Sequence, residues 1–182
     1  MGGFLLVALA EETFLRGYLQ FTLSRGLGQI YQRLLEPSRA NILGFWTAAA
    51  ALSFVFGLGH VANSGESPLG LLSAGLIGLV FCLSLWRTGS LWWAIGFHAA
   101  WDWAQSFLYG VPDSGLMVKG HLFATYPSGP AFLSGGLTGP EASLFLLPVL
   151  AAAVAVVVFT LPSVRDAVAA RHAPTLTALD LP

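Results

Sequence analysis

Charged residues are scarce in this sequence. Of its 182 residues only 9% are Asp, Glu, Lys or Arg, whereas a soluble globular domain carries about 25%. Hydrophobic residues make up 55% of the chain, which is more than a soluble fold of this length can bury. The composition therefore predicts a membrane protein and excludes an ordinary soluble domain.

Three further absences narrow the class of protein. The net charge of -1 is spread thinly, without a basic patch, so we expect no nucleic-acid partner. Cys82 is the single cysteine, which excludes an intrachain disulfide and a CxxC metal site. The segment Met1-Gly2-Gly3 lacks the basic region that opens a cleavable signal peptide.

What the chain has instead is a series of apolar runs near the ~20 residues that a bilayer core requires. This pattern predicts an all-α fold, a polytopic transmembrane bundle of about five helices with an active site between helices. The runs are Gly3 to Leu23, Asn41 to Ala62, Leu69 to Trp86, Leu91 to Tyr109 and Ala142 to Leu161.

The basic residues between these runs predict an orientation. Cytoplasmic loops of membrane proteins are enriched in Lys and Arg, which makes the first loop, the third loop and the C-terminus cytoplasmic here. Only Lys119 falls on the opposite side, in a Gly- and Pro-rich segment, 110–140, that we interpret as an external or interfacial loop. The residues on the cytoplasmic side are Arg25, Arg33, Arg39, Arg87, Arg165 and Arg171.

The first apolar run contains charged residues near its centre, where a membrane makes charge energetically unfavourable. Glu11, Glu12 and Arg16 lie inside it, and each such side chain at a membrane helix centre costs roughly 2.5 to 3.5 kcal/mol. Glu12 and Arg16 are four residues apart and share a helix face, while Glu11 is turned about 100° away. We therefore expect Arg16 to pair with Glu12 and to leave Glu11 free. A purely structural ion-pair cluster is the alternative.

Two further apolar runs contribute ionisable groups. His60 ends the second run, and Phe56 lies four residues before it on the same face. His98 and Asp102 are also four residues apart, so the carboxylate can fix the orientation and tautomer of the imidazole. Hydrogen-bonded structural roles remain an alternative for these residues too.

A carboxylate and two imidazoles inside a helix bundle favour hydrolytic chemistry. They could activate a water molecule and stabilise the oxyanion of a tetrahedral intermediate. The same groups could hold a zinc ion with an open position. Both alternatives lead to hydrolysis of an acyl bond.

At these residues the sequence resembles the CaaX-protease and bacteriocin-processing (CPBP, or Abi) family of intramembrane endopeptidases. The family pattern is EExxxR, then FxxxH, then HxxxN or HxxxD, on separate helices. Here the motifs span Glu11 to Arg16, Phe56 to His60 and His98 to Asp102. The resemblance covers residues 11–102 and extends loosely to the Gly-rich loop and the last helix.

The resemblance implies roles for four residues. Glu11 and His60 would activate the attacking water, and His98 and Asp102 would form the oxyanion site. Family members are described both as metalloproteases and as glutamate-dependent proteases without a bound metal. Zinc therefore stays open, with Glu11, His60 and His98 as its candidate ligands.

We interpret the chain as an intramembrane endopeptidase of a prokaryotic cell membrane, acting on a membrane-associated peptide or protein substrate by CaaX-type processing or related peptide maturation. Family members have further helices before the EExxxR helix, so we expect the protease domain, residues 1–162, to lack N-terminal helices and residues 163–182 to be a short polar tail. The alternatives are a non-catalytic immunity or scaffold protein and, less well supported without an internal repeat, a proton-coupled transporter. Supporting roles fall to Glu12, Arg16 and Phe56.

Overall fold

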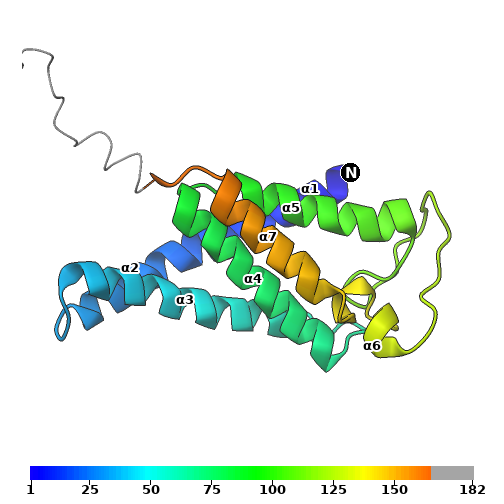
Figure 1. Ribbon diagram of the computed structural model, residues 1–182, viewed down its shortest axis with the longest axis horizontal. Helices are drawn as coiled ribbons and strands as arrows, with labels where there is room; N and C mark the ends of the chain where they lie inside the picture. Colours follow the sequence, from blue (N-terminus) through cyan, green and yellow to red (C-terminus); the bar gives the residue numbers. More distant parts are fainter. Residues whose placement is uncertain (165–182) are drawn as a thin grey trace, which may run out of the picture.

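The computed structural model describes residues 1–164, and in this range the chain is helical, without strands (Figure 1). The all-α prediction is therefore confirmed. The α-helices are α1 Gly2–Glu12, α2 Gln20–Tyr31, α3 Pro37–Gly59, α4 Pro68–Thr88, α5 Trp92–Trp103, α6 Ala131–Ser134 and α7 Leu146–Thr160. Two π-helical segments, η1 Thr13–Leu19 and η2 Ala104–Tyr109, continue α1 and α5, and a 3-10 turn, η3, spans Pro140–Ala142.

Local sequence signals explain where α4 begins and ends. Pro68 stands in the first turn, where the missing N–H costs nothing, and the Ser67 hydroxyl accepts a hydrogen bond from Gly70 N at 3.2 Å. Gly89 ends the helix with a φ of 67°, a left-handed conformation that glycine adopts without strain. Pro37 marks the first turn of α3 in the same way.

The N-terminal helix is longer than the apolar run that predicts it. α1, η1 and α2 follow one another without a break from Gly2 to Tyr31, and the predicted end at Leu23 is wrong. The prediction of a first loop containing three arginines is also wrong, because Arg25 lies in α2 and Arg39 in α3. Hydropathy falls after Leu23, but the helix continues because it packs along α3.

Glycines permit this close packing. A Cβ at Gly44 of α3 would lie 2.7 Å from the backbone nitrogen of Gly28 in α2. Similarly, a Cβ at Gly57 would lie 2.5 Å from the carbonyl oxygen of Leu71 in α4. The α2–α3 and α3–α4 pairs therefore have their backbones in near contact, as small residues allow in membrane helices. α1 packs against α5, and α4 against α7.

Two of the described helices, α3 and α4, are long and apolar enough to cross a membrane. α7 is apolar but shorter. The bundle of five spanning helices therefore stays a prediction, which the length and composition of these two helices support. Polar side chains interrupt the remaining runs, among them the buried Gln105 and Ser106 in η2.

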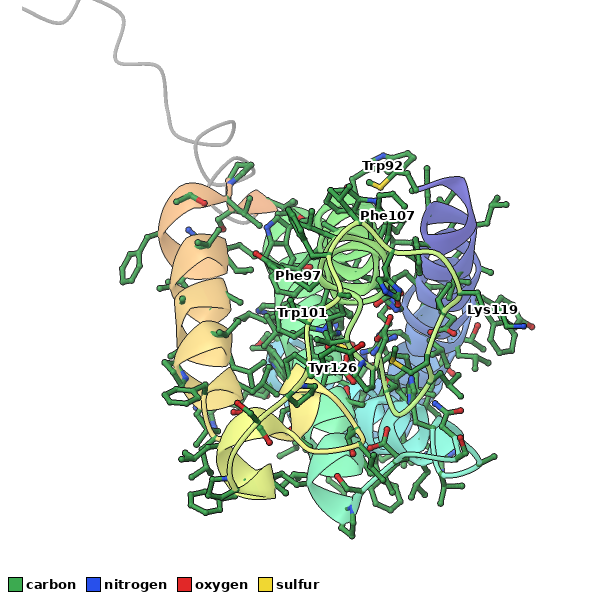
Figure 2. All side chains as sticks on the ribbon, turned by 90° about the vertical axis from the view of Figure 1, so that its right-hand side faces the viewer. Trp92, Phe97, Trp101, Phe107, Lys119 and Tyr126 are labelled. Carbon is green, nitrogen blue, oxygen red and sulfur yellow. The ribbon has the colours of Figure 1, made fainter. Side chains whose placement is uncertain are left out.

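The segment 110–140 folds back onto the helices instead of standing clear of them. Its residues Leu122 and Phe123 donate backbone hydrogen bonds to Phe107 and Leu108 of η2. Gly115 is buried, and a Cβ there would lie 2.5 Å from the Glu66 nitrogen. Figure 2 shows Lys119 and Tyr126 on this segment, in front of the helices. An interfacial position is compatible with this packing, but part of the segment also belongs to the interior.

The predicted orientation can be tested by cysteine labelling in whole cells. We expect a cysteine at Arg33 to be labelled only from the cytoplasmic side and one at Lys119 only from the opposite side, because both positions are exposed. The background should carry Cys82→Ala, which removes the buried native thiol. A cysteine replacing Arg87 should behave like one at Arg33. Labelling of positions 33 and 119 from the same side would contradict the orientation.

Candidate active site

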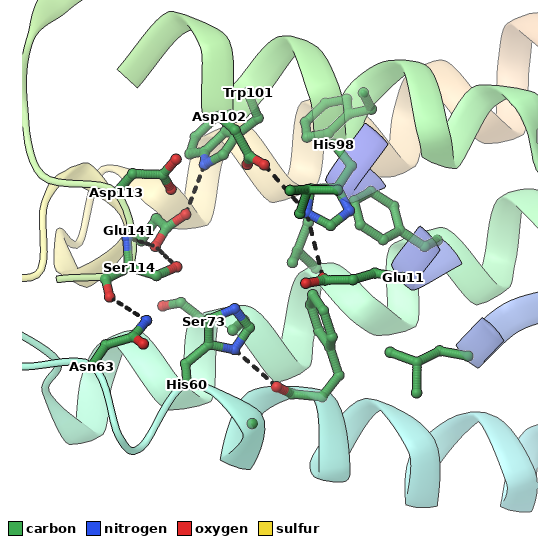
Figure 3. Close-up of a pocket in the computed structure, with 18 of the residues that line it drawn as sticks. Glu11, His60, Asn63, Ser73, His98, Trp101, Asp102, Asp113, Ser114 and Glu141 are labelled. Carbon is green, nitrogen blue, oxygen red and sulfur yellow. Dashed lines mark hydrogen bonds and ion pairs between the residues drawn. The ribbon is translucent and has the colours of Figure 1, made fainter. Parts of the chain in front are cut away.

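A cavity of about 730 Å³ lies between α1, α3, α5 and the segment that follows η2 (Figure 3). All four predicted site residues line it. Glu11 comes from the end of α1, His60 from the C-terminal cap of α3, and His98 and Asp102 from α5. The structure therefore brings together groups that the sequence places up to 91 residues apart.

The Glu12–Arg16 ion pair is sealed in the protein interior. Arg16 Nη1 donates to Glu12 Oε1 at 3.0 Å, and the two side chains are 1% and 0% exposed. The guanidinium lies over the Phe56 ring, 4.2 Å from its centroid, which places a cation on an electron-rich face. Gly78 of α4 leaves space for it, since a Cβ there would lie 2.7 Å from Arg16 Nη2. The predicted pairing is confirmed, and Phe56 supports it.

Glu11 differs from its neighbour in exposure. Its side chain is 40% exposed and lines the cavity, whereas Glu12 is completely buried. Glu11 Oε2 lies 3.8 Å from His98 Nε2, beyond hydrogen-bond distance. Arg16 thus engages Glu12 as predicted and makes no ion pair with Glu11, whose ion-pair contact is the long one to His98.

His98 connects the ion pair to the cavity. Its Nδ1 donates to Glu12 Oε1 at 3.0 Å, because a carboxylate oxygen can only accept. Its Nε2 lies 3.5 Å from Asp102 Oδ2, which confirms the predicted pair within α5. The ring also stacks on Phe81, with centroids 5.7 Å apart. The contact between Glu12 and His98 crosses from one helix to another, and sequence spacing could not predict it.

His60 is oriented by its own helix. Its Nδ1 donates to the Phe56 carbonyl oxygen at 2.9 Å, which leaves Nε2 as the acceptor nitrogen. The imidazole meets the Phe56 ring edge-on, with centroids 5.1 Å apart. Within residues 1–164, no hydrogen bond or ion pair joins His60 to Glu11. The structure brings the two residues to one cavity without placing them in contact.

The cavity has a second wall, centred on Glu141, that the sequence did not predict. The carboxylate of this residue accepts four hydrogen bonds, and Figure 3 shows it with Ser114 and Trp101 at the end of the cavity away from Glu11. Trp101 Nε1 (2.9 Å) and Gln105 Nε2 (3.1 Å) donate to Oε1, and Ser114 N (3.0 Å) and Oγ (2.7 Å) donate to Oε2. The only sequence signal is an acidic residue just before the last apolar run.

Asp113 is the other carboxylate of this wall. Gln105 Nε2 donates to its Oδ1 at 3.3 Å, and Ser106 Oγ donates to its Oδ2 at 3.0 Å. Burial raises the pKa of Asp113 to about 8, and the negative charges of Asp102 and Glu141 act in the same direction. The hydrogen bond from Ser106 opposes this rise.

The candidate zinc ligands do not form a metal site. Catalytic zinc sites have three protein ligands and an open position. Within residues 1–164, no three His, Cys, Asp or Glu side chains gather closely enough to hold a metal ion. Of the candidates, His98 already directs Nδ1 to Glu12 and has Nε2 between Asp102 and Glu11. The residues do not fit a zinc ion, and we derive no step through one.

The structure is an all-helical bundle in which ionisable side chains from three helices line one cavity. A family model described as Rce1-like, type II CAAX prenyl endopeptidase, matches residues 1–104, more than half of the chain. The chain belongs to this Rce1-like family, a membrane-embedded protease family within the CPBP group. The match includes all three motifs and ends before Asp113 and Glu141. No curated protein and no solved structure matches the chain.

Proposed function

We propose that this protein is an intramembrane endopeptidase that hydrolyses a peptide bond in a membrane-associated substrate, in CaaX-type processing or related peptide maturation. One observation carries the proposal. Glu11, His60, His98 and Asp102, from three helices, line one cavity, while Glu12 is held outside it by Arg16. A cluster with a purely structural role would not need a half-exposed carboxylate facing a cavity.

In this mechanism Glu11 and His60 activate water. Glu11 Oε2 or His60 Nε2 accepts a hydrogen bond from a water molecule, and Glu11 takes its proton as the oxygen attacks the substrate carbonyl carbon. The tetrahedral intermediate then collapses, the C–N bond breaks, and Glu11 returns the proton to the leaving nitrogen. Both groups line the same cavity, so a water molecule bound between them can contact Glu11 and His60.

The oxyanion requires a donor, and we assign this role to His98 alone. Its Nε2–H, in the imidazolium form, lies 3.5 Å from Asp102 and 3.8 Å from Glu11, both longer than an ordinary hydrogen bond. That N–H is therefore available to a substrate oxygen. Ionised Asp102 would repel an oxyanion, so it acts as a positioning residue that stabilises the imidazolium.

The proposal is tested by cleavage of a membrane-peptide library with purified protein. We expect products whose masses sum to the substrate plus one water, and no products with Glu11→Ala. Dialysis against a chelator should not abolish activity, because no step uses a metal. A wild-type protein that binds library peptides but cleaves none would favour the non-catalytic alternative, an immunity or scaffold role.

A further inference from the structure

The two sides of the cavity are connected through Glu141. On one side, the turn after His60 contains Asn63, whose Nδ2 donates to the Ser114 carbonyl oxygen at 2.7 Å. Ser114 in turn donates its N–H and its hydroxyl to Glu141 Oε2. On the other side, Glu141 Oε1 accepts from Trp101, the neighbour of Asp102 in α5. A continuous chain of hydrogen bonds thus joins the end of α3 to α5 (Figure 3).

The helix carrying Trp101 packs against α1 on one side and has an aromatic ladder on the other. Trp101 stacks on Phe97 with centroids 5.9 Å apart, and Phe97 stacks on Trp93 at 5.2 Å. These aromatic side chains pack against α7, whose core residues include Leu146 and Leu150. The indole N–H is the polar end of this ladder. Its bond to Glu141 therefore links this ladder to the second wall of the cavity.

We propose that Glu141 is a positioning residue, which holds the His60 side of the cavity at the correct distance from His98 and Asp102. This inference rests on the proposed hydrolysis. Hydrolysis needs His60 and the oxyanion donor His98 at a fixed separation around one carbonyl group, and an error of about 1 Å in that separation can cost about 100-fold in rate. Glu141 lies outside the residues matched by the family model.

A carboxylate suits this position better than an amide. Each oxygen of Glu141 accepts two donors, so both ends of the side chain must be acceptors. A glutamine has one oxygen, and its NH2 group would face either Trp101 and Gln105 or Ser114, donor against donor. Glu141→Gln therefore removes the two hydrogen bonds at one end of the side chain, keeps the two at the other end, and preserves the size of the side chain.

The first test separates kcat from KM. With Glu141→Gln we expect kcat to fall about 10- to 100-fold, as outer residues that orient catalytic groups do, with KM changed less than about threefold. Trp101→Phe keeps the ring and removes one donor, so it should lower kcat too, and the double variant should lose less than the product of the two losses. Glu36→Gln removes the same charge at an exposed turn and serves as the matched control.

A second readout does not depend on activity. In hydrogen exchange on detergent-solubilised protein, Glu141→Gln should speed exchange in peptides covering 111–116 and 60–66. Normal kcat with Glu141→Gln, or exchange equal to that of Glu36→Gln, would overturn the inference. If wild-type protein cleaves no peptide, the proposed function falls as well, whereas loss of the inference alone leaves wild-type cleavage intact.

Discussion

Glu11→Gln should abolish cleavage while leaving the protein folded and inserted. A glutamine cannot accept the proton of the attacking water, and loss of a general base typically costs about 10²- to 10⁴-fold in rate. The side chain is 40% exposed and its contact with His98 is long, so its removal should cost little stability. The measurement is the cleavage rate beside the melting temperature in detergent. Glu36→Gln provides the control for charge.

The neighbouring glutamate makes this prediction sharp. Glu11 and Glu12 are identical in chemistry and adjacent in sequence, yet only Glu11 faces the cavity. A folded but inactive Glu12→Gln variant beside a fully active Glu11→Gln variant would show that the base has been assigned to the wrong carboxylate.

Breaking the Glu12–Arg16 ion pair is expected to have a large effect on the stability of the fold. Arg16→Gln should lower the free energy of unfolding by about 3–5 kcal/mol, because it removes the guanidinium that pairs with the completely buried Glu12. Glu12→Gln should cost a similar amount by leaving Arg16 unpaired. The double variant should cost less than the two single variants together, because the second change removes the charge that the first left unpaired. Thermal melts and denaturant titrations in detergent measure this difference.

The two single variants should differ in activity. Glu12 Oε1 also accepts from His98 Nδ1, so Glu12→Gln weakens the bond that orients the imidazole. The cleavage rate of Glu12→Gln should fall by more than its lowered melting temperature explains. The cleavage rate of Arg16→Gln should fall only as far as its loss of stability explains. Arg16→Lys keeps the charge but loses the planar contact over Phe56. Equal activity per folded molecule in Glu12→Gln and Arg16→Gln would contradict a catalytic role for the Glu12–His98 bond.

Contacts within one helix were predictable from the sequence. The pairs Glu12–Arg16 and His98–Asp102 follow from the spacing of four residues, because helix geometry alone places such side chains together. The contact from Glu12 to His98 depends instead on α1 packing against α5. The order in which helices pack is not encoded in local spacing, so this bond could not be predicted.

The second wall of the cavity was missed for a different reason. Asp113 lies in a loop and Glu141 in the 3-10 turn η3, and both segments are too short for periodicity to fix the direction of a side chain. Their position depends on tight glycine contacts, such as Gly65 against Gly115, that become visible only in three dimensions. The end of α2 was missed because hydropathy measures polarity, and a helix can continue through polar residues when a partner helix covers it.

The π-helical segment η1 limits where the N-terminal helix can lose a residue. π turns close i→i+5 hydrogen bonds, so they hold more residues than α turns and shift the phase between the helix before them and the helix after them. That phase sets the buried face of α1, with Ala8 and Glu12, against the buried face of α2, with Gln20 and Gly28. Loss of one residue here would rotate one face by about 100° relative to the other. Chain length in this segment is therefore as constrained as the identity of the glutamates.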